Sequence, residues 1–383
     1  MDIKQFTPNA PGKLIIETGI PGADHAFLPD FLPPAWEWPS ELWPLLIDAH
    51  KELARLDGIG RHLPDPNLLL RPLQHREAQR SSRLEGTFTN PQQQMLFELE
   101  PTESNTEDAS VNAFREVANY SRALRKGIQQ LEDGFPFSQL LIRELHRTLL
   151  DGVRGSDSHP GEFRDCLVQI GRPPRFIPPP PLYLPELLEN YEQIAQRPNR
   201  MYDPLVDAFI MHYQFEAIHP FEDGNGRVGR LLLSLMIAKW NNLSNQWLYM
   251  SSYFDANKDE YMERLLRVST HNDWKGWMQF CLIGVVEQAQ DTQKRCDHLM
   301  QLSASYKDRI TSLAGSWRLQ SIVENLFHTP VVTISSVSKR YGISYPTAKS
   351  DVNKLVEAGI LQELPNNYPK TYFAPEIFDI TYG

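Results

Sequence analysis

The segment that most constrains this chain is the run from His219 to Arg230, with the sequence His-Pro-Phe-Glu-Asp-Gly-Asn-Gly-Arg-Val-Gly-Arg. An apolar helical pattern over 203–217 precedes it, and Asp203 and Pro204 are suited to the N-cap and the first helical position. A second helical pattern follows over 227–240. The segment must therefore form a short loop between two helices, and its glycines permit the positive φ angles that such a loop needs.

The loop and the start of the second helix are together suited to bind a phosphate. Gly224, Asn225 and Gly226 can turn their N–H groups toward one point, where the helix also presents unpaired N–H groups and the positive end of its dipole. Arg227 and Arg230 lie three positions apart and share a helix face. Two cations at a helix N-terminus oppose the dipole unless an anion lies between them, and guanidinium groups bind phosphate through two parallel hydrogen bonds.

Two further side chains of the segment suggest a reaction. Asp223 offers hard oxygen ligands to Mg²⁺, which keeps water and phosphate oxygens in its coordination shell. His219 can accept a proton from an attacking hydroxyl group. The alternative is a charged helix start beside a histidine that is merely hydrogen-bonded. Five chemically specific residues within twelve positions argue against that alternative.

The segment resembles the signature of the Fic family, H-P-F-x-[D/E]-G-N-G-R-x-x-R, at every fixed position. Most members are protein adenylyltransferases, so the resemblance implies transfer of AMP from Mg-ATP to a hydroxyl side chain of a target protein. ATP and Mg²⁺ are the implied cofactors. The implied roles are a general base (His219), a loop anchor (Phe221), the Mg²⁺ ligand (Asp223), an anion hole (Gly224, Asn225, Gly226), and ligands of the β-phosphate (Arg227) and γ-phosphate (Arg230).

The resemblance extends to a second region, which begins at Pro160-Gly161-Glu162-Phe163-Arg164 and is similar to the flap of the family, a β-hairpin that lies over the nucleotide. It implies nucleotide contacts from four consecutive residues (Val168, Gln169, Ile170, Gly171). It also implies that the target protein docks on 163–171 as an added strand. Asn257 and Tyr261 lie where the family places residues near adenine, and an N-cap role for Asn257 is equally consistent.

A shorter motif, Ser-Ser-Arg-Leu-Glu-Gly, covers Ser81 to Gly86. Ser81 and Glu85 share one helix face, and Gly86 is suited to end the helix. A Glu in the last turn faces the negative end of the helix dipole at a cost of about 0.3–1 kcal/mol, which an opposing cation offsets. The stretch resembles the inhibitory motif [S/T]-x-x-x-E-[G/N], which implies that Glu85 pairs with Arg230 in the place of the γ-phosphate and inhibits the enzyme.

The remaining pattern predicts a mainly α fold with one β-hairpin in the body and a small C-terminal winged helix-turn-helix domain. The resemblance implies that the body is a Fic-fold helical core with a β-hairpin flap. Helical patterns recur near 41–56, 68–85, 110–130, 137–150, 184–196, 203–217, 227–240, 257–268 and 273–300. The single strand predicted in the body is Leu167–Ile170, and prolines over 29–44 predict an extended arm. The predicted domains are an N-terminal arm with the inhibitory helix (1–105), the catalytic core (106–300) and a domain of three helices and a hairpin (316–383).

Charge and cysteine content narrow the class of protein. The 38 basic and 48 acidic residues give a formal net charge of −10, which argues against a surface built throughout for nucleic acid. Three widely spaced cysteines (Cys166, Cys281, Cys296) predict neither a disulfide framework nor a zinc site. Without a signal sequence or a membrane-spanning run, we expect a cytoplasmic protein with no membrane contact. A homodimer is an expectation from the family alone.

Two alternatives to this interpretation stay open. In the first, the chain is a winged-helix transcriptional regulator whose Fic core senses nucleotide or modifies its own chain. Residues 316–383 carry as many acidic as basic side chains, so DNA binding and protein contact are equally consistent with them. In the second, a Fic enzyme uses another phosphate-containing donor or removes AMP.

Overall fold

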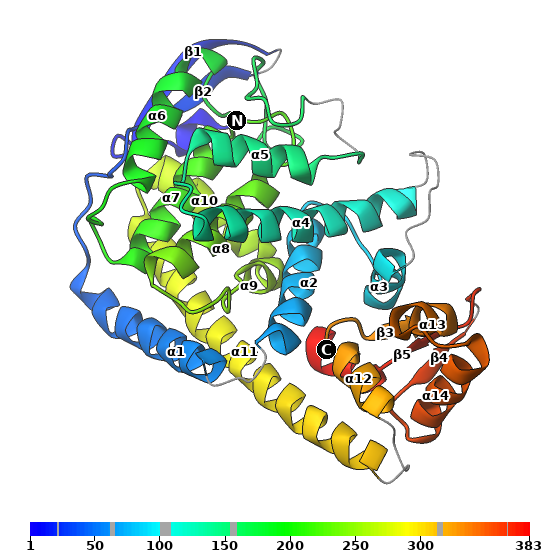
Figure 1. The fold of residues 1–383 in the computed structure, drawn as a ribbon. Helices are drawn as coiled ribbons and strands as arrows, with labels where there is room; N and C mark the ends of the chain where they lie inside the picture. The colour runs from blue at the N-terminus through cyan, green and yellow to red at the C-terminus, as the bar shows by residue number, and fades with distance from the viewer. Residues whose placement is uncertain (21–22, 62–65, 100–108, 154–158, 312–316, 366) are drawn as a thin grey trace.

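The computed structural model describes residues 1–20, 23–61, 66–99, 109–153, 159–311, 317–365 and 367–383 and is mostly helical (Figure 1). The predicted boundary at 105–106 and Ser316 lie outside the described residues. The α-helices are α1 (Trp43–Arg61), α2 (Asn67–Leu84), α3 (Pro91–Leu99), α4 (Ala109–Glu132), α5 (Gln139–Leu149), α6 (Leu184–Ala195), α7 (Pro204–Ile218), α8 (Asn225–Trp240), α9 (Ser251–Ala256), α10 (Lys258–His271), α11 (Trp274–Thr311), α12 (Trp317–Leu326), α13 (Ile334–Tyr341), α14 (Tyr345–Glu357) and α15 (Pro375–Tyr382). The strands are β1 (Gly12–Ile20), β2 (Ala23–Pro29), β3 (Val331–Thr333), β4 (Gln362–Leu364) and β5 (Thr371–Phe373).

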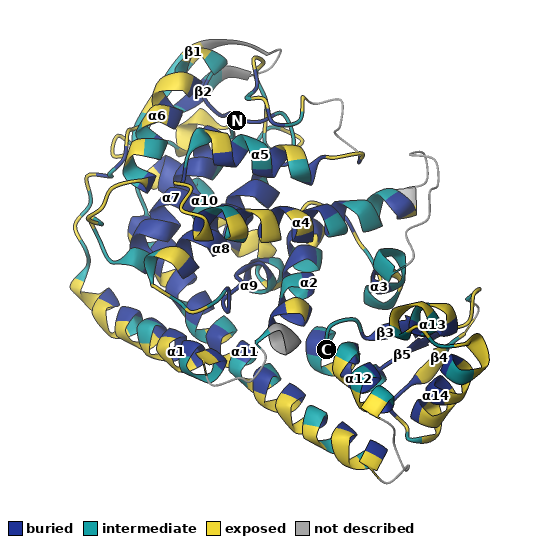
Figure 2. Cartoon of the chain, viewed as in Figure 1, coloured by how far each residue is buried: buried dark blue, intermediate teal, exposed yellow. Residues whose placement is uncertain are grey.

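Helices α7 and α8 form the centre of the fold, as the burial colours of Figure 2 show. Both are buried around most of their circumference, which explains why apolar residues occupy every face of α7 rather than one stripe. Asp203 caps α7 by accepting a hydrogen bond from Leu205 N at 2.9 Å, and Pro204 follows at the first helical position, as the sequence predicts. The two central helices pack on each other, and α4, α5, α6, α10 and α11 pack around them.

Helix α2 brings the motif from Ser81 to Gly86 to the core. It packs against α4, α8 and α9, and Glu85, the residue after its end, lies against Gly226 at the start of α8. Residues of α2 that face the core are almost fully buried, among them Ser81 and Ser82. The tertiary position of α2 therefore places its last turn beside the loop that carries the signature segment.

The β-hairpin of the body is not where the sequence predicts it. The predicted strand Leu167–Ile170 forms one isolated bridge, in which Ile170 N donates to Phe176 O at 2.8 Å. Gly171 has φ 86°, and Pro173 and Pro174 have no N–H to donate, so the ladder cannot extend. The regular hairpin is β1–β2 in the N-terminal arm, which the prolines over 29–44 obscured.

The C-terminal part contains the elements that the sequence predicts, three helices (α12, α13, α14) and the strands β4 and β5. Thr333 caps α13 in a capping box with Ser336, and Gly359 follows α14 with φ 69°. The sequence missed β3, which makes the strand order β3-β5-β4, and it missed α3, α9 and α15. Helix α11 extends to Thr311, beyond the predicted residue 300, and connects the core to this part. Within the described residues, no helix is both long and apolar enough to cross a membrane.

Candidate active site

Two residues with positive φ angles and the side-chain amide of Asn225 shape the loop of the signature segment. His219 ends α7 with φ 50°, and Gly224 precedes α8 with φ 79°. The Asn225 side chain accepts a hydrogen bond from Phe221 N at 2.9 Å and donates one to Phe221 O at 2.8 Å. Phe221 is fully buried, as expected for a loop anchor. Asn225, predicted as part of an anion hole, thus also holds the loop in its folded form.

His146 of α5 packs against the same loop. Its ring stacks on Phe221 with a centroid distance of 3.7 Å. Its Nδ1 accepts from Gly161 N at 2.8 Å, so the hydrogen-bond geometry assigns the ring proton to Nε2, which lies 3.0 Å from Asp223 O. Burial lowers the pKa of His146 to about 4, so the ring is neutral at pH 7. His146 therefore joins the flap region to the loop.

Arg164 fastens the flap to the end of α7, a role that the sequence did not reveal. The buried guanidinium donates to the backbone oxygens of His219 at 2.8 Å, Cys166 at 2.8 Å and Pro179 at 2.6 Å. Burial lowers the pKa of Arg164 to about 10, which leaves the side chain charged at pH 7. Burying a cation whose partners are carbonyl oxygens costs free energy. Because Arg164 lies beside His219, its charge also affects the pKa of that histidine.

The predicted base is neutral in this environment. Burial and then the charge of Arg164 lower the pKa of His219 to about 4, against an opposing effect of Glu85. The Nδ1 atom of His219 is buried and has no hydrogen-bond partner among the described residues. A neutral imidazole has one unprotonated ring nitrogen, which can accept a proton.

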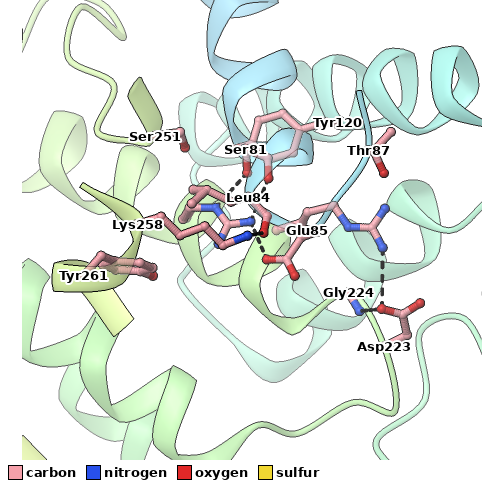
Figure 3. Close-up of polar contacts among 12 residues, drawn as sticks. Ser81, Leu84, Glu85, Thr87, Tyr120, Asp223, Gly224, Ser251, Lys258 and Tyr261 are labelled. Atoms are coloured by element: carbon pink, nitrogen blue, oxygen red, sulfur yellow. Dashed lines mark hydrogen bonds and ion pairs between the residues drawn. The ribbon is translucent and has the colours of Figure 1, made fainter. Parts of the chain in front are cut away.

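Glu85 lies against Arg230, as the resemblance implies (Figure 3). The Arg230 side chain is 3% exposed, and its Nη2 donates to Glu85 Oε1 at 2.7 Å. Ser81 provides two more acceptors, Oγ at 2.9 Å from Nε and the backbone oxygen at 2.9 Å from Nη2. A Cβ atom added at Gly226 would lie 2.2 Å from Glu85 Oε1, so Glu85 also covers the start of α8. Burial is the largest effect on the pKa of Glu85 and raises it, but the charge and the hydrogen bond of Arg230, together with further nearby charges such as that of Arg227, lower it by more in sum, and the carboxylate is ionised at pH 7.

Buried polar contacts hold α2 in this position, and the sequence did not reveal them. Glu77 is 1% exposed and accepts from Tyr120 Oη at 2.9 Å and Ser251 Oγ at 2.5 Å, which joins α2 to α4 and α9. Lys258 donates to the Leu84 carbonyl at 2.6 Å and so caps the end of α2 (Figure 3). Because these partners come from distant parts of the chain, no local pattern points to them.

The second arginine of the segment has a carboxylate partner of its own. Arg227 is 2% exposed, and its Nη1 lies 3.3 Å from Oε2 of the buried Glu116 on α4. Its Nη2 lies 3.7 Å from Oδ1 of Asp223, whose side chain is 47% exposed and also accepts from Gly224 N at 2.6 Å. One accessible carboxylate beside a phosphate-binding helix start is the donor set that Mg²⁺ uses together with phosphate oxygens and water, so Asp223 fits the predicted role.

A cavity of about 420 Å³ opens beside His219. Of the predicted site residues, those that line it are Glu85, Ile170, Gly171, His219, Gly226, Arg230 and Tyr261. Tyr261 forms part of the wall, where its ring stacks on Phe254 at 4.3 Å and its hydroxyl lies 2.8 Å from His212 Nε2. The volume of the cavity is in the range of small-molecule sites.

Six predicted nucleotide contacts do not line this cavity: Gly224, Asn225 and Arg227 of the signature segment, Val168, Gln169, and Asn257. Val168 and Gln169 lie in the flap but outside the lining residues. Asn257 precedes α10, makes no side-chain capping bond, and donates from Nδ2 to Tyr253 O at 3.0 Å. The structure therefore brings the signature segment, the inhibitory motif and Tyr261 together, but it directs the Asn257 amide to α9.

Two segments of the chain match models of a known protein family. Residues 43–129 match the Fic/DOC family N-terminal region, and residues 136–237 match the Fic/DOC family. Over 149 residues the chain is 30% identical to a probable protein adenylyltransferase of Aquifex aeolicus, covering 39% of this chain and 44% of that protein. Over 142 residues it is 31% identical to protein adenylyltransferase Fic of Aedes aegypti, covering 36% of this chain and 26% of that protein. The chain thus spans less than half the length of these two relatives.

Two solved structures share the fold. A Fic family protein from Desulfovibrio desulfuricans G20 superposes with a TM-score of 0.58 at 19% identity, covering 89% of this chain and 98% of that one. A Fic domain containing signaling protein from Bacteroides thetaiotaomicron VPI-5482 superposes with a TM-score of 0.52 at 21% identity, covering 65% of this chain and 97% of that one. At these identities the likeness concerns the fold.

Replacing Ser81 by Ala tests the contact between α2 and Arg230. The substitution leaves the buried Nε donor of Arg230 without its hydroxyl acceptor, so we expect the free energy of unfolding to fall by about 1–3 kcal/mol. The measurement is urea unfolding followed by circular dichroism. Ser82→Ala is the matched control, because the neighbouring Ser82 hydroxyl is buried without a partner among the described residues and its loss should not destabilise. Equal losses in both variants would contradict the assignment.

Proposed function

The chain belongs to the Fic/DOC family, and we propose that it is a protein adenylyltransferase held inactive by Glu85. It would transfer AMP from Mg-ATP to a hydroxyl side chain of a target protein. The observation that carries the proposal is the cavity in which His219, the start of α8 and Arg230 meet, with the Glu85 carboxylate bound to Arg230. The adenylyltransferase names of the relatives agree with this reaction.

The proposed reaction assigns each group a separate task. The α-phosphate lies at the N-terminus of α8, where the backbone N–H groups and the helix dipole stabilise its charge. His219 takes the proton of the target hydroxyl as that oxygen attacks the α-phosphorus, and the bond to the bridging oxygen breaks to release pyrophosphate. Mg²⁺ held by Asp223 would neutralise part of the phosphate charge. The neutral state of His219, caused by burial and Arg164, supports its role as the base.

The proposed inhibition follows from competition for one guanidinium group. A γ-phosphate on Arg230 needs the Nη2 donor that Glu85 and the Ser81 carbonyl share. It would also meet the negative charge of Glu85 at short range, which is unfavourable in a buried site. ATP can bind productively only after Glu85 has left Arg230.

The target protein is proposed to dock along 163–171. Arg164 fixes this segment to the body, and within the described residues its one strand-like pairing is the bridge from Ile170 to Phe176. Gln169 is exposed, and Val168 and Ile170 are half-buried. An extended peptide could therefore add to the outer backbone edge of the segment.

Duplex DNA is a second candidate partner, which we propose for the C-terminal part. Helix α14 carries two acidic residues, Asp351 and Glu357, of which Glu357 is exposed at its C-terminal end. Asp351 is 2% exposed and accepts from Arg318 Nε at 2.6 Å, so this ion pair neutralises its charge. The exposed side of α14 carries Lys349, Asn353 and Lys354, which are suited to contact phosphates and base edges.

Release of the inhibition is tested by Glu85→Gly. With Mg²⁺ and ATP labelled at the α-phosphate, we expect cell lysate proteins to be labelled at least about tenfold more strongly by the variant than by the wild type, because Arg230 is free for the γ-phosphate. Adding His219→Ala to Glu85→Gly should reduce the rate by about 10²–10⁴-fold, since the base is lost. Equal labelling by the wild type and Glu85→Gly, or full activity of the double variant, would contradict the proposal.

The pH dependence of the labelling rate tests the state of His219. A histidine with an ordinary pKa near 6.5 would be about fourfold less active as a base at pH 6 than at pH 8. Because burial and Arg164 lower the pKa of His219 to about 4, the neutral form persists at pH 6. Glu85→Gly also removes a charge that raises this pKa, so we expect its initial rate at pH 6 to be within about twofold of that at pH 8. A rate midpoint near 6.5 would show an ordinary histidine.

DNA binding is tested by gel shift of the full chain with a mixed-sequence duplex. We expect a shift at low salt that weakens steeply as salt rises, because phosphate contacts release counterions. Lys349→Glu should weaken the shift by about tenfold. Lys51→Glu, an equal charge change on the exposed side of α1, should leave it unchanged. No shift, or equal weakening by both variants, would exclude α14 as the DNA contact.

A further inference from the structure

A buried carboxylate on α4 engages the arginine that the proposed function assigns to the β-phosphate. Glu116 and Arg227 are 3% and 2% exposed, and Glu116 Oε2 lies 3.3 Å from Arg227 Nη1. The two residues are 111 positions apart in the chain. A buried guanidinium held by a buried carboxylate keeps one orientation, because any other would leave both charges uncompensated.

The same carboxylate oxygen also contacts the segment that carries Glu85. Thr87 follows α2 by three residues, is 6% exposed, and donates from Oγ1 to Glu116 Oε2 at 2.5 Å. Arg227 and Thr87 therefore share one acceptor atom. The end of α2 reaches both arginines of the signature segment, Arg230 through Glu85 and Arg227 through Thr87 and Glu116.

Arg227 keeps donors for a further acceptor while Glu116 holds it. Its ion pair with Glu116 uses Nη1, and Nη2 lies 3.7 Å from the accessible Asp223. Its Nε is buried without a hydrogen-bond partner among the described residues. A guanidinium has five N–H donors in a fixed plane, so a phosphate can use the remaining ones without displacing Glu116.

We propose that Glu116 is a positioning residue, which orients Arg227 for the β-phosphate and is itself held by the Thr87 hydroxyl. This inference rests on the proposed function, because Arg227 is assigned to the β-phosphate there. It adds a second connection between α2 and the phosphate site. Movement of the end of α2 that withdraws Glu85 from Arg230 then also changes the support of Arg227.

The experiment compares the affinities for ADP and AMP, which differ by the β-phosphate. Isothermal titration calorimetry with Mg²⁺ would use the full chain with Glu85→Ala as the parent, which removes the inhibitory carboxylate without placing a second glycine before Thr87. Adding Glu116→Ala should weaken ADP binding by about tenfold or more, because Arg227 loses the hydrogen bond that orients it. AMP binding should change by less than about twofold, since AMP has no β-phosphate.

Conservative variants separate positioning from folding. Glu116→Gln keeps an acceptor beside Arg227 and should restore ADP affinity to within about threefold of the parent. Thr87→Val removes the donor with little change of shape and should weaken ADP binding by about threefold, while Thr87→Ser should restore it. Because AMP binds the same site, unchanged AMP affinity shows that each variant is folded.

Two results would overturn the inference in different ways. A Glu116→Ala protein that binds ADP as tightly as the parent, or more tightly, would overturn it alone, since Glu116 would then only compete with phosphate. Failure of the parent to bind ADP and AMP at all would overturn the proposed function and this inference together. A parallel loss of ADP and AMP affinity in both Glu116→Ala and Thr87→Val would assign a structural role to Glu116.

Discussion

Two buried guanidinium groups in the first two turns of α8 set the requirements for the surrounding structure. Arg227 and Arg230 are 2% and 3% exposed and lie at the positive end of a helix dipole. Neither is stable there without an anion. Glu116 meets this requirement for Arg227 and Glu85 for Arg230. Only the pair of Glu116 and Arg227 is buried on both sides. Removing one partner of such a pair typically costs about 3–5 kcal/mol, so Glu116 holds Arg227 while no phosphate is bound.

The same cations explain how a resting enzyme of this kind would be both stable and inhibited. Without nucleotide, the carboxylates of the chain satisfy the site that phosphates would otherwise occupy. Glu85 is 38% exposed and comes from the end of a helix, whereas Glu116 is 4% exposed and lies within one. Glu85 can therefore leave Arg230 by a movement of the end of α2. Glu116 stays with Arg227 because it is buried and lies within a helix.

Burial also decides the proton chemistry of the loop. His146 and His219 both have a pKa lowered to about 4, largely by burial, so neither carries a charge at pH 7. His146 uses its neutral ring to accept from Gly161 N, which holds the flap region against the loop. His219 retains a buried ring nitrogen without a partner among the described residues. The two histidines share a charge state and differ in which ring nitrogens are hydrogen-bonded. His146 supports the loop, and the proposed function assigns proton transfer to His219.

Much of the site was predictable because its residues are close together in the sequence. The signature segment spans twelve positions, and its loop, its helix start and the shared face of Arg227 and Arg230 follow from local geometry. Helix patterns located α7 and α8 because their apolar stretches are long. The flap failed as a strand prediction, since prolines after Gly171 remove the donors that a ladder needs. The hairpin β1–β2 was missed because the prolines that follow it dominated the interpretation of that region.

The sequence by itself determined the glycine-containing loop before α8, the motif from Ser81 to Gly86 and the mainly helical fold, because each is encoded by neighbours along the chain. The tertiary structure alone decided which partners these groups meet. Glu116 with Arg227, Arg164 with the carbonyl of His219, and Glu77 with Ser251 are each more than 50 positions apart. Such pairs arise because a buried charge must find its counterpart wherever the packing of helices brings one, and no local pattern records that choice.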